Sequence, residues 1–349
     1  MHSAADSGVT VVEGEIVTHS FPRGVMTQSA MLQALDPTQF DVAVMSWNVR
    51  YLTLPRAIAR SRRRRVPLLL WGHGTSKNPA FATDLLRRTY GKFADGVILY
   101  DHHTADNLKL LRGFTEHNVF VAQNALDQTP ILSARNEWNR CGLKLEGFRT
   151  RHQLNPAKTF LLVSRLLPEN RADLLIEMMW RLQQECADAK LVIVGDGPDR
   201  QRLEKITRDY GIDQSVIFTG AIYDEQELAP WMLSSTALVY PGNMGLSLLH
   251  AFGYSLPVIT GNRLQGHGPE IHALRDGQNG LFFEDGNVEQ LLARCRRVIE
   301  SPEFTQQLAQ SAFETVKTDY TIGRMVDGFA RGLESVTGQS QSNVIRRAA

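Results

Sequence analysis

The sequence predicts an α/β protein built from two doubly wound domains with parallel sheets. Apolar runs rich in Val, Ile and Leu recur along the 349-residue chain, and helical patterns separate them. These runs are continuous rather than alternating, which is typical of strands buried on both faces. Helices between such strands indicate parallel βα units. A chain of this length also exceeds what one hydrophobic core usually holds, which favours two domains.

The expected strands fall into two groups. The first group is 40–47, 66–74, 94–100 and 118–123, preceded by an apolar run at 8–17; the second is 159–165, 189–197, 215–221, 236–242 and 256–261. No clear strand occurs between 128 and 157. We therefore predict an N-terminal domain over 1–150, a C-terminal domain over 151–337 that ends in helix, and a tail over 338–349.

Composition and residue spacing argue against a membrane-spanning protein, a secreted protein and a zinc protein. The chain is 43% hydrophobic and 21% charged, as in ordinary globular proteins. No apolar run approaches the roughly 20 residues that span a bilayer, and the first residues lack the basic-then-apolar pattern of a signal peptide. The three cysteines are widely separated and show no zinc-site spacing. We expect a cytoplasmic protein that binds no metal.

One basic run stands out in a chain whose net charge is only +1. Arg60 is followed by Arg62, Arg63, Arg64 and Arg65, at the end of a predicted helix where cations suit the helix dipole. The pattern favours a solvated helix end. A peripheral contact with anionic lipid at the inner face of the plasma membrane stays open as the alternative. Nucleic-acid binding is disfavoured because no aromatic residues interleave the run.

Three turns follow predicted strands of the second domain, where ligands bind in doubly wound sheets. In 164–171, Arg165 is placed to pair with phosphate. In 241–247, Gly245 allows a ligand close to the backbone, and the N–H groups that open the next helix favour an anion. In 194–198, Gly195 and Gly197 are equally well explained as plain turn glycines.

Five motifs occur in order along the second domain: LLVSRLLPENRADLLIEMM, KLVIVGDGPDRQRLE, VIFTGAIYDEQELAPWM, VYPGNMGLSLLHAFGYSLPVIT and HGPEIHALRDGQNGLFF. Together they resemble the C-terminal domain of the retaining glycosyltransferases of family 4. These have the GT-B fold, two Rossmann-like domains facing across a cleft. The Pro-Gly…Gly-Leu…His-Ala pattern resembles a subgroup of bacterial surface-polysaccharide and lipopolysaccharide assembly. With LLLWGHG, ADGVILYDHHTADNLKLL and VFVAQNALD upstream, the resemblance covers roughly 40–335.

The resemblance implies transfer of a sugar from a UDP-, GDP- or TDP-linked donor to a glycan or lipid-linked acceptor, with retention and without metal or other cofactor. It also implies roles for individual residues: Arg165 at the phosphates; Met244, Gly245, Leu246 and Ser247 at the sugar and diphosphate; Glu270 near the donor; Gly220 and Ala221 at the base; and His73 near the donor sugar. Glu270 serves equally well as a helix cap. For His102 and His103, acceptor contact and plain exposure are equal alternatives.

The chain departs from the family pattern in three places. Gly242 and His250 occupy the positions of two family glutamates, and His250 is expected either to bind ribose or to pack under the loop. Asn170, followed by Arg171, stands where a phosphate-binding lysine is expected. The N-terminal domain is expected to lack its first strand and Gly-rich loop. Two further hypotheses stay open: an inactive homologue that only binds its ligand or a partner, and a sugar-nucleotide epimerase.

Overall fold

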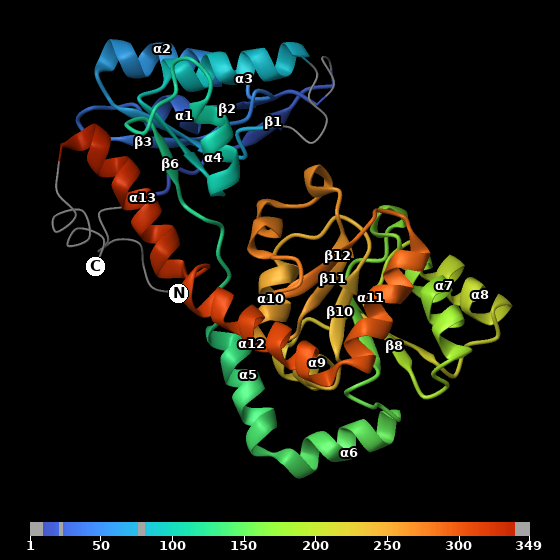
Figure 1. Cartoon of the computed structure of the whole chain (residues 1–349). Helices are drawn as coiled ribbons and strands as arrows, with labels where there is room; N and C mark the ends of the chain where they lie inside the picture. Colours follow the sequence, from blue (N-terminus) through green and yellow to red (C-terminus); the bar gives the residue numbers. More distant parts are fainter. Residues whose placement is uncertain (1–9, 21–23, 76–80, 339–349) are drawn as a thin grey trace. The chain divides into compact units, whose positions relative to one another are not determined.

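The computed structural model describes residues 10–20, 24–75 and 81–338 of the chain (Figure 1). The chain forms two compact units. Unit 1 combines residues 1–124 with 323–349, and unit 2 is the continuous segment 125–322. The sequence placed the domain boundary at 150, whereas the chain passes between the units at 124–125 and again at 322–323. Of the expected tail, only Gly338 lies within the described residues.

Unit 1 contains a parallel sheet in the order β3-β4-β5-β6, which confirms the four strands expected at 40–123. Its elements are β1 (Ile16–Thr18), β2 (Met26–Gln28), α1 (Ala30–Gln33), β3 (Ala43–Ser46), α2 (Leu54–Arg64), β4 (Leu68–Gly72), α3 (Phe81–Phe93), β5 (Gly96–Leu99), α4 (His102–Lys109), β6 (Val119–Val121) and the C-terminal α13 (Ile322–Thr337). The apolar run at 8–17 overlaps only β1, which pairs antiparallel with β2 and is exposed. It is therefore not a core strand; residues 8 and 9 lie outside the described part.

Both faces of the unit 1 sheet are covered. Leu68 and Leu70 of β4 pack into a core shared with α2 and α4, while Leu69 between them packs on the opposite face. That opposite face is covered by α13, through Phe329 and Leu333 among others. Figure 1 shows α13, in red, on the side of the sheet away from α2 and α3. Continuous apolar strands are thus explained by burial on two sides.

Unit 2 contains a six-stranded parallel sheet in the order β12-β11-β10-β7-β8-β9. Its elements are α5 (Thr129–Arg140), α6 (Gly142–His152), β7 (Thr159–Val163), η2 (Pro168–Asn170), α7 (Ala172–Gln183), β8 (Lys190–Val194), α8 (Arg200–Asp209), β9 (Val216–Gly220), α9 (Glu225–Leu233), β10 (Ala237–Tyr240), α10 (Ser247–Gly253), β11 (Val258–Gly261), η3 (Leu264–Gly266), η4 (Pro269–Ala273), β12 (Gly280–Phe283), α11 (Val288–Glu300) and α12 (Pro302–Thr318). The five expected strands are confirmed, and β12 is an additional one. The segment 128–157, where no strand was expected, forms α5 and α6.

The strand order of unit 2 fixes where a ligand would bind. From β7 the chain builds outward through β8 to β9, then returns to the other side of β7 with β10 and continues to β12. The direction of winding therefore reverses between β7 and β10. In doubly wound sheets the crevice outside the carboxyl ends of the strands at this switch point is where ligands bind.

Helix starts in both units are marked by side-chain caps. Asp101 accepts a hydrogen bond from the Thr104 N–H at the start of α4, and Asp224 accepts two from the first turn of α9. Such caps satisfy N–H groups that have no partner within the helix.

Among the helices of the described residues, none has the length and hydropathy needed to cross a membrane.

Candidate functional site

The switch point of unit 2 brings two loops together at the carboxyl ends of β7 and β10. The Ser164 hydroxyl, just past β7, lies 3.0 Å from the Tyr240 hydroxyl at the end of β10. The Asn170 amide donates to Ser164 Oγ and to the Arg165 carbonyl oxygen, both at 2.8 Å. A short polar chain therefore fixes the loop after β7 against β10 and sets the backbone position of Arg165.

Gly242 is held by close packing against the same loop. A Cβ added at Gly242 would lie 2.5 Å from the Cα of Asn170 and 2.8 Å from the Glu169 carbonyl oxygen. Real Cβ atoms do not approach backbone this closely, so a side chain here would force the two loops apart. The two departures from the family pattern, Gly242 and Asn170, are therefore neighbours in space.

The three polar side chains expected near phosphate behave differently. Arg165 is exposed, and its guanidinium forms no hydrogen bond or ion pair with any residue in the described part of the chain. Arg171, in contrast, donates through Nε to Asp173 at 3.3 Å. Asn170 is committed to the loop itself. Arg165 is thus the cation available to an anion at the switch point.

The loop after β10 is fixed on its other side by a buried histidine. His267 is 7% exposed, its Nδ1 lies 3.2 Å from the Met244 N–H, and its Nε2 lies 3.0 Å from the Gly261 carbonyl oxygen. Because Nδ1 must accept and Nε2 must donate, these two bonds select the neutral tautomer with the proton on Nε2. The Gly268 N–H donates in turn to the Met244 carbonyl oxygen at 2.8 Å. His267 therefore ties the loop to the end of β11.

Glu270 lies beside the same loop. It is 3% exposed, and a Cβ at Gly245 would come within 3.6 Å of its Oε2. At Gly268 the corresponding distance would be only 2.3 Å. The structure thus brings Glu270 next to Gly245, while Leu246 is 41% exposed and Ser247 begins the seven-residue α10.

His250 has a carboxylate partner that the sequence did not suggest. Its Nε2 lies 2.8 Å from Glu225 Oε1, and the Tyr254 hydroxyl donates to the same oxygen at 2.6 Å. Burial works to raise the pKa of Glu225, but the hydrogen bonds from His250 and Tyr254 outweigh it and leave that pKa below its ordinary value. Burial, with the Glu225 hydrogen bond, raises the pKa of Tyr254. The first residue of α9 is thereby joined to α10.

The other predicted residues of unit 2 follow β8 and β9. A Cβ at Gly197 would lie 2.3 Å from the Leu166 carbonyl oxygen, so packing alone accounts for this glycine. Gly220 has a φ of +81°, and its carbonyl oxygen accepts from the Gly195 N–H at 2.8 Å. Ala221, next to it, is exposed. These positions line the same carboxyl edge of the sheet.

The three predicted histidines of unit 1 also lie at a carboxyl edge. His73 follows β4, is exposed, and has its ring 4.6 Å from that of Tyr100, which follows β5. His102 and His103 open α4 directly after Asp101, and both are exposed. The structure therefore groups these histidines with one another around the ends of β4 and β5.

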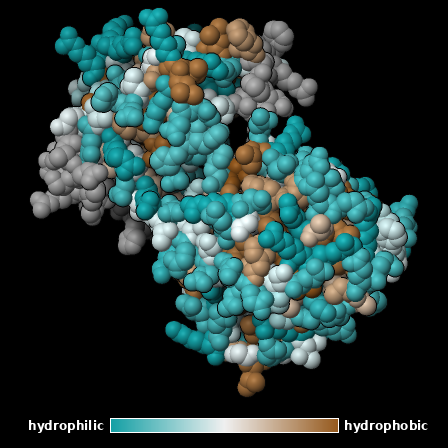
Figure 2. Space-filling view, viewed as in Figure 1, coloured by the Kyte–Doolittle hydropathy of each residue, from teal (hydrophilic) through white to brown (hydrophobic). Residues whose placement is uncertain are grey.

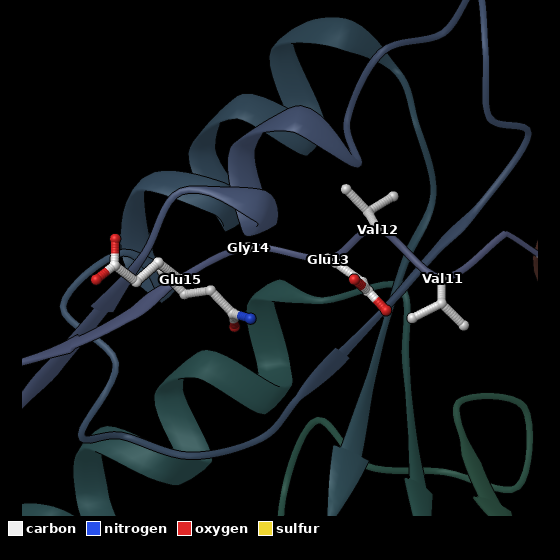
Figure 3. A pocket seen from close by; sticks show the side chains of 6 residues that line it. Val11, Val12, Glu13, Gly14 and Glu15 are labelled. Atoms are coloured by element: carbon white, nitrogen blue, oxygen red, sulfur yellow. The ribbon is translucent and has the colours of Figure 1, made fainter.

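A shallow hollow elsewhere in unit 1 has the wrong charge for phosphate. It is lined by Val11, Val12, Glu13, Gly14, Glu15 and Gln28. Figure 3 shows the side chains of Glu13 and Glu15 on the irregular segment before β1 that borders it. Two carboxylates without a cation among the lining residues repel an anionic ligand. The hollow is therefore distinct from the candidate site in unit 2.

Sequence reasoning missed His267 and Glu225. His267 lies in a quoted motif, but nothing in the sequence shows that its ring reaches back to Met244. Glu225 precedes His250 by 25 residues, and only the fold places α9 beside α10. The role of both residues follows from a tertiary contact, which no spacing of residues in the sequence indicates.

Comparison with known proteins finds glycosyltransferases among those similar to this chain. Residues 148–315, just under half of the chain, match the family model "Glycosyl transferases group 1". A GDP-mannose-dependent alpha-(1-6)-phosphatidylinositol monomannoside mannosyltransferase of Mycolicibacterium smegmatis is 27% identical over 255 residues, which are 70% of this chain and 63% of that protein. The lipopolysaccharide core biosynthesis glycosyltransferase LpsE of Rhizobium meliloti is 24% identical over 42% of each chain. The chain spans half or less of the length of the first curated relatives it matches.

Similarity to solved structures extends over both units. The Anabaena protein HepE in complex with UDP superposes with a TM-score of 0.67, at 18% identity, covering 88% of this chain and 82% of that one. At this identity the likeness shows the fold, which is GT-B, with two Rossmann-like units as expected from the sequence.

Proposed function

We propose that this protein is a retaining glycosyltransferase of bacterial surface-polysaccharide assembly. It would take a sugar from a nucleotide-sugar donor bound at the carboxyl edge of the unit 2 sheet and transfer it to a glycan or lipid-linked acceptor. The observation that carries the proposal is the switch point between β7 and β10, where the loop that carries the exposed Arg165 packs through Asn170 against Gly242. The family match over 148–315 and the glycosyltransferases among the relatives support it.

In the proposed complex, the Arg165 guanidinium pairs with the donor diphosphate. Gly245 allows the sugar and phosphates close to the backbone of 244–247, and Glu270 lies beside that loop. The base lies against the main chain at Gly220 and Ala221. For the ribose we propose the polar pair of His250 and Glu225, since a carboxylate and an imidazole together offer both acceptors and donors to hydroxyl groups.

The proposed reaction requires the protein to stabilise the diphosphate leaving group of the donor. As the bond between the anomeric carbon and the diphosphate oxygen breaks, negative charge develops on that oxygen. Arg165 stabilises this charge, and fixed donors in a site of this kind typically contribute a few kcal/mol. The acceptor oxygen bonds to the anomeric carbon on the same face of the sugar that the diphosphate leaves, and its proton passes to the departing diphosphate oxygen, so the anomeric configuration is retained. No metal ion is required in this scheme.

The acceptor is assigned to unit 1, whose carboxyl edge presents His73, His102 and His103.

A binding experiment tests the donor site. We expect one of UDP, GDP or TDP to raise the melting temperature, because a ligand at 100 times its dissociation constant adds about 2.7 kcal/mol of stability. Arg165→Ala should weaken that binding roughly tenfold to a hundredfold, the range for a lost charge-assisted hydrogen bond. Arg208→Ala is the matched control, since Arg208 is exposed at the end of α8 in the same unit. Equal affinity of the two variants for every nucleotide tested would reject the phosphate role of Arg165.

A transfer experiment tests the reaction. The nucleotide that binds is supplied as its sugar conjugate with candidate acceptors, and the anomeric configuration of the product is read by NMR with and without EDTA. Retention in the presence of EDTA would support the scheme. Inversion, or activity that EDTA abolishes and magnesium restores, would contradict it.

One observation favours a second candidate, a homologue that binds a nucleotide without turnover. Asn170 replaces the expected lysine and is committed to the loop, and Arg171 is paired with Asp173. Of the three residues expected at the phosphates, only Arg165 is then left to pair with the proposed diphosphate. Tight nucleotide binding without transfer to any acceptor, and without hydrolysis of the donor, would favour this candidate.

A further inference from the structure

The outer face of α3 is apolar, whereas the solvent-facing side of a helix that covers a sheet is usually polar. Four large hydrophobic residues of this helix are exposed: Phe81 at 85%, Leu85 at 55%, Phe93 at 49% and Leu86 at 40%. Helical spacing places them on the side away from Arg87 and Gly91, which are buried against the unit 1 core. Scattered surface leucines are common, but a cluster on one helix face marks an interaction surface.

The basic run of α2 adjoins this apolar face. The Arg62 guanidinium lies over the Phe93 ring, 5.0 Å from its centroid, and Arg62 Nε donates to the Phe93 carbonyl oxygen at 3.2 Å. Arg62 and Arg63 are exposed on the outer side of α2. Figure 2 shows hydrophobic residues exposed at the top of the view, over α3, beside hydrophilic residues of the adjoining helix.

The charges on this surface are unevenly balanced. Residues 54–65 contain six arginines and no acidic residue, and α3 adds Lys92. The one acidic residue of α3, Asp84, is paired with Arg88 at 2.5 Å. No carboxylate on either helix is left to neutralise the arginines of α2; Asp36, before β3, interacts with Arg60 and Arg64 but, among the described residues, forms no ion pair with Arg62 or Arg63. Such a surface suits a partner that is itself anionic over a broad area.

We propose that the outer face of α2 and α3 is a docking surface for an anionic lipid bilayer. Apolar side chains at the headgroup boundary together with arginines at the headgroups are the two contributions that hold an interfacial helix on an anionic membrane. The sequence alone favoured a solvated helix end for the arginine run. In the fold, the apolar face of α3 lies beside that run, and this favours a lipid contact over a solvated helix end.

A second protein fits this surface less well. Arginine and phenylalanine both occur at protein interfaces, but six arginines without an acidic residue in 54–65, next to Phe93, are more charge of one sign than an interface core usually holds. A bilayer accepts this mixture because headgroup phosphates and acyl chains lie within a few ångströms of each other in depth. The lipid surface also needs no shape complementarity from the helix pair.

Sedimentation with vesicles tests the proposal on the full chain. We expect binding to vesicles of phosphatidylcholine with phosphatidylglycerol, weaker binding to phosphatidylcholine alone, and loss of binding at high salt. Arg62→Ala with Arg63→Ala should weaken binding roughly thirtyfold, from the usual contribution of a basic residue near an anionic surface. Leu85→Ser with Phe93→Ser should weaken it at least tenfold on both kinds of vesicle, because the lost contribution is apolar.

Two control variants separate this surface from general effects. Leu143→Ser removes a leucine that is 93% exposed on α6, and Arg208→Ala removes an exposed arginine of α8; both should bind vesicles as the parent does. Melting temperatures check that each variant folds. Failure of the folded parent to bind anionic vesicles, or equal loss of binding in the controls, would overturn the proposal. So would a dimer that the Leu85 and Phe93 variant converts to a monomer. None of these outcomes depends on whether the protein transfers a sugar.

Discussion

At the scale of single residues, the loop after β10 is held by one imidazole. His267 accepts from the buried Met244 N–H and donates to the Gly261 carbonyl oxygen, so one ring connects the loop to the end of β11. Leaving a buried backbone N–H such as that of Met244 without a partner costs free energy. The position of the proposed donor loop therefore depends on the tautomer and the integrity of this side chain.

We predict that His267→Ala destabilises the protein by about 1–3 kcal/mol, the usual cost of leaving a buried hydrogen-bonding group unpaired. Nucleotide binding should weaken as well, because the loop loses its anchor. His267→Gln should recover part of both losses, since its amide offers one acceptor and one donor. Denaturant unfolding and nucleotide titration measure the two effects. Gln265→Ala, at an exposed position of the neighbouring η3, should change neither; a similar loss there would argue against a specific role for His267.

The residues that could be predicted from sequence are those whose role follows from strand ends. Arg165, Gly245 and Ala221 follow predicted strands, and the structure places each at the carboxyl edge of the sheet. The pairing of Gly242 with Asn170 could not be predicted, because it depends on how closely two loops approach. In the structure Gly242 packs directly against the backbone of Asn170, and a side chain at position 242 would leave no room for that contact.

At the scale of elements, Glu225 joins two helices that follow different strands. It begins α9, directly after its cap Asp224, and receives hydrogen bonds from His250 of α10 and from Tyr254, which directly follows α10. The start of α9 is therefore held to the last turn of α10. The strands around them were predictable from apolar runs, but the pairing of helices was not, because it follows from the strand order.

We predict that the stability conferred by the Glu225 carboxylate is lost in acid. Its pKa in the folded protein lies below the usual value near 4.3, so the contribution is complete above that value and disappears as the pH falls through the lower, folded-state pKa. The stability difference between the parent protein and Glu225→Gln should thus be constant from neutral pH to about pH 5 and shrink below it. Urea unfolding across this range measures the difference.

Glu227→Gln provides the comparison on the same helix. Glu227 is exposed in the first turn of α9, and its side chain has no hydrogen bond to another described residue. Its substitution should change stability little and without a marked pH dependence. If both variants showed the same pH profile, the effect would belong to the helix end in general rather than to the contact with α10.

At the scale of the whole molecule, unit 1 is assembled from two distant parts of the chain. The helix α13 covers the face of the sheet formed by Leu69, Ile98 and Ala122, although some two hundred residues of unit 2 intervene. The sequence predicted a helix here that packs back across the domains, but the boundary at 150 assigned it to the C-terminal domain. A boundary drawn along the chain could not show that the last helix belongs with the first domain.

We predict that removing α13 selectively destabilises unit 1. A chain ending at Tyr320 would leave Leu69 and Ile98 of the sheet face open to water, and exposing a buried leucine or isoleucine costs about 1.5–3 kcal/mol. Limited proteolysis should then cut within 24–124 while unit 2 stays intact. A chain ending at Gly338 keeps α13 and is the control. Equal resistance of the two chains would show that α13 is dispensable for unit 1.

The return of α13 also sets an order of assembly during synthesis. The ribosome releases residues 24–121 first, yet the face of their sheet has no cover until the last helix emerges. Unit 2, being continuous, can close as soon as residue 322 has left the exit tunnel. Unit 1 is therefore begun before unit 2 and completed after it, and until then Leu69 and Ile98 are candidates for chaperone contact in the cell.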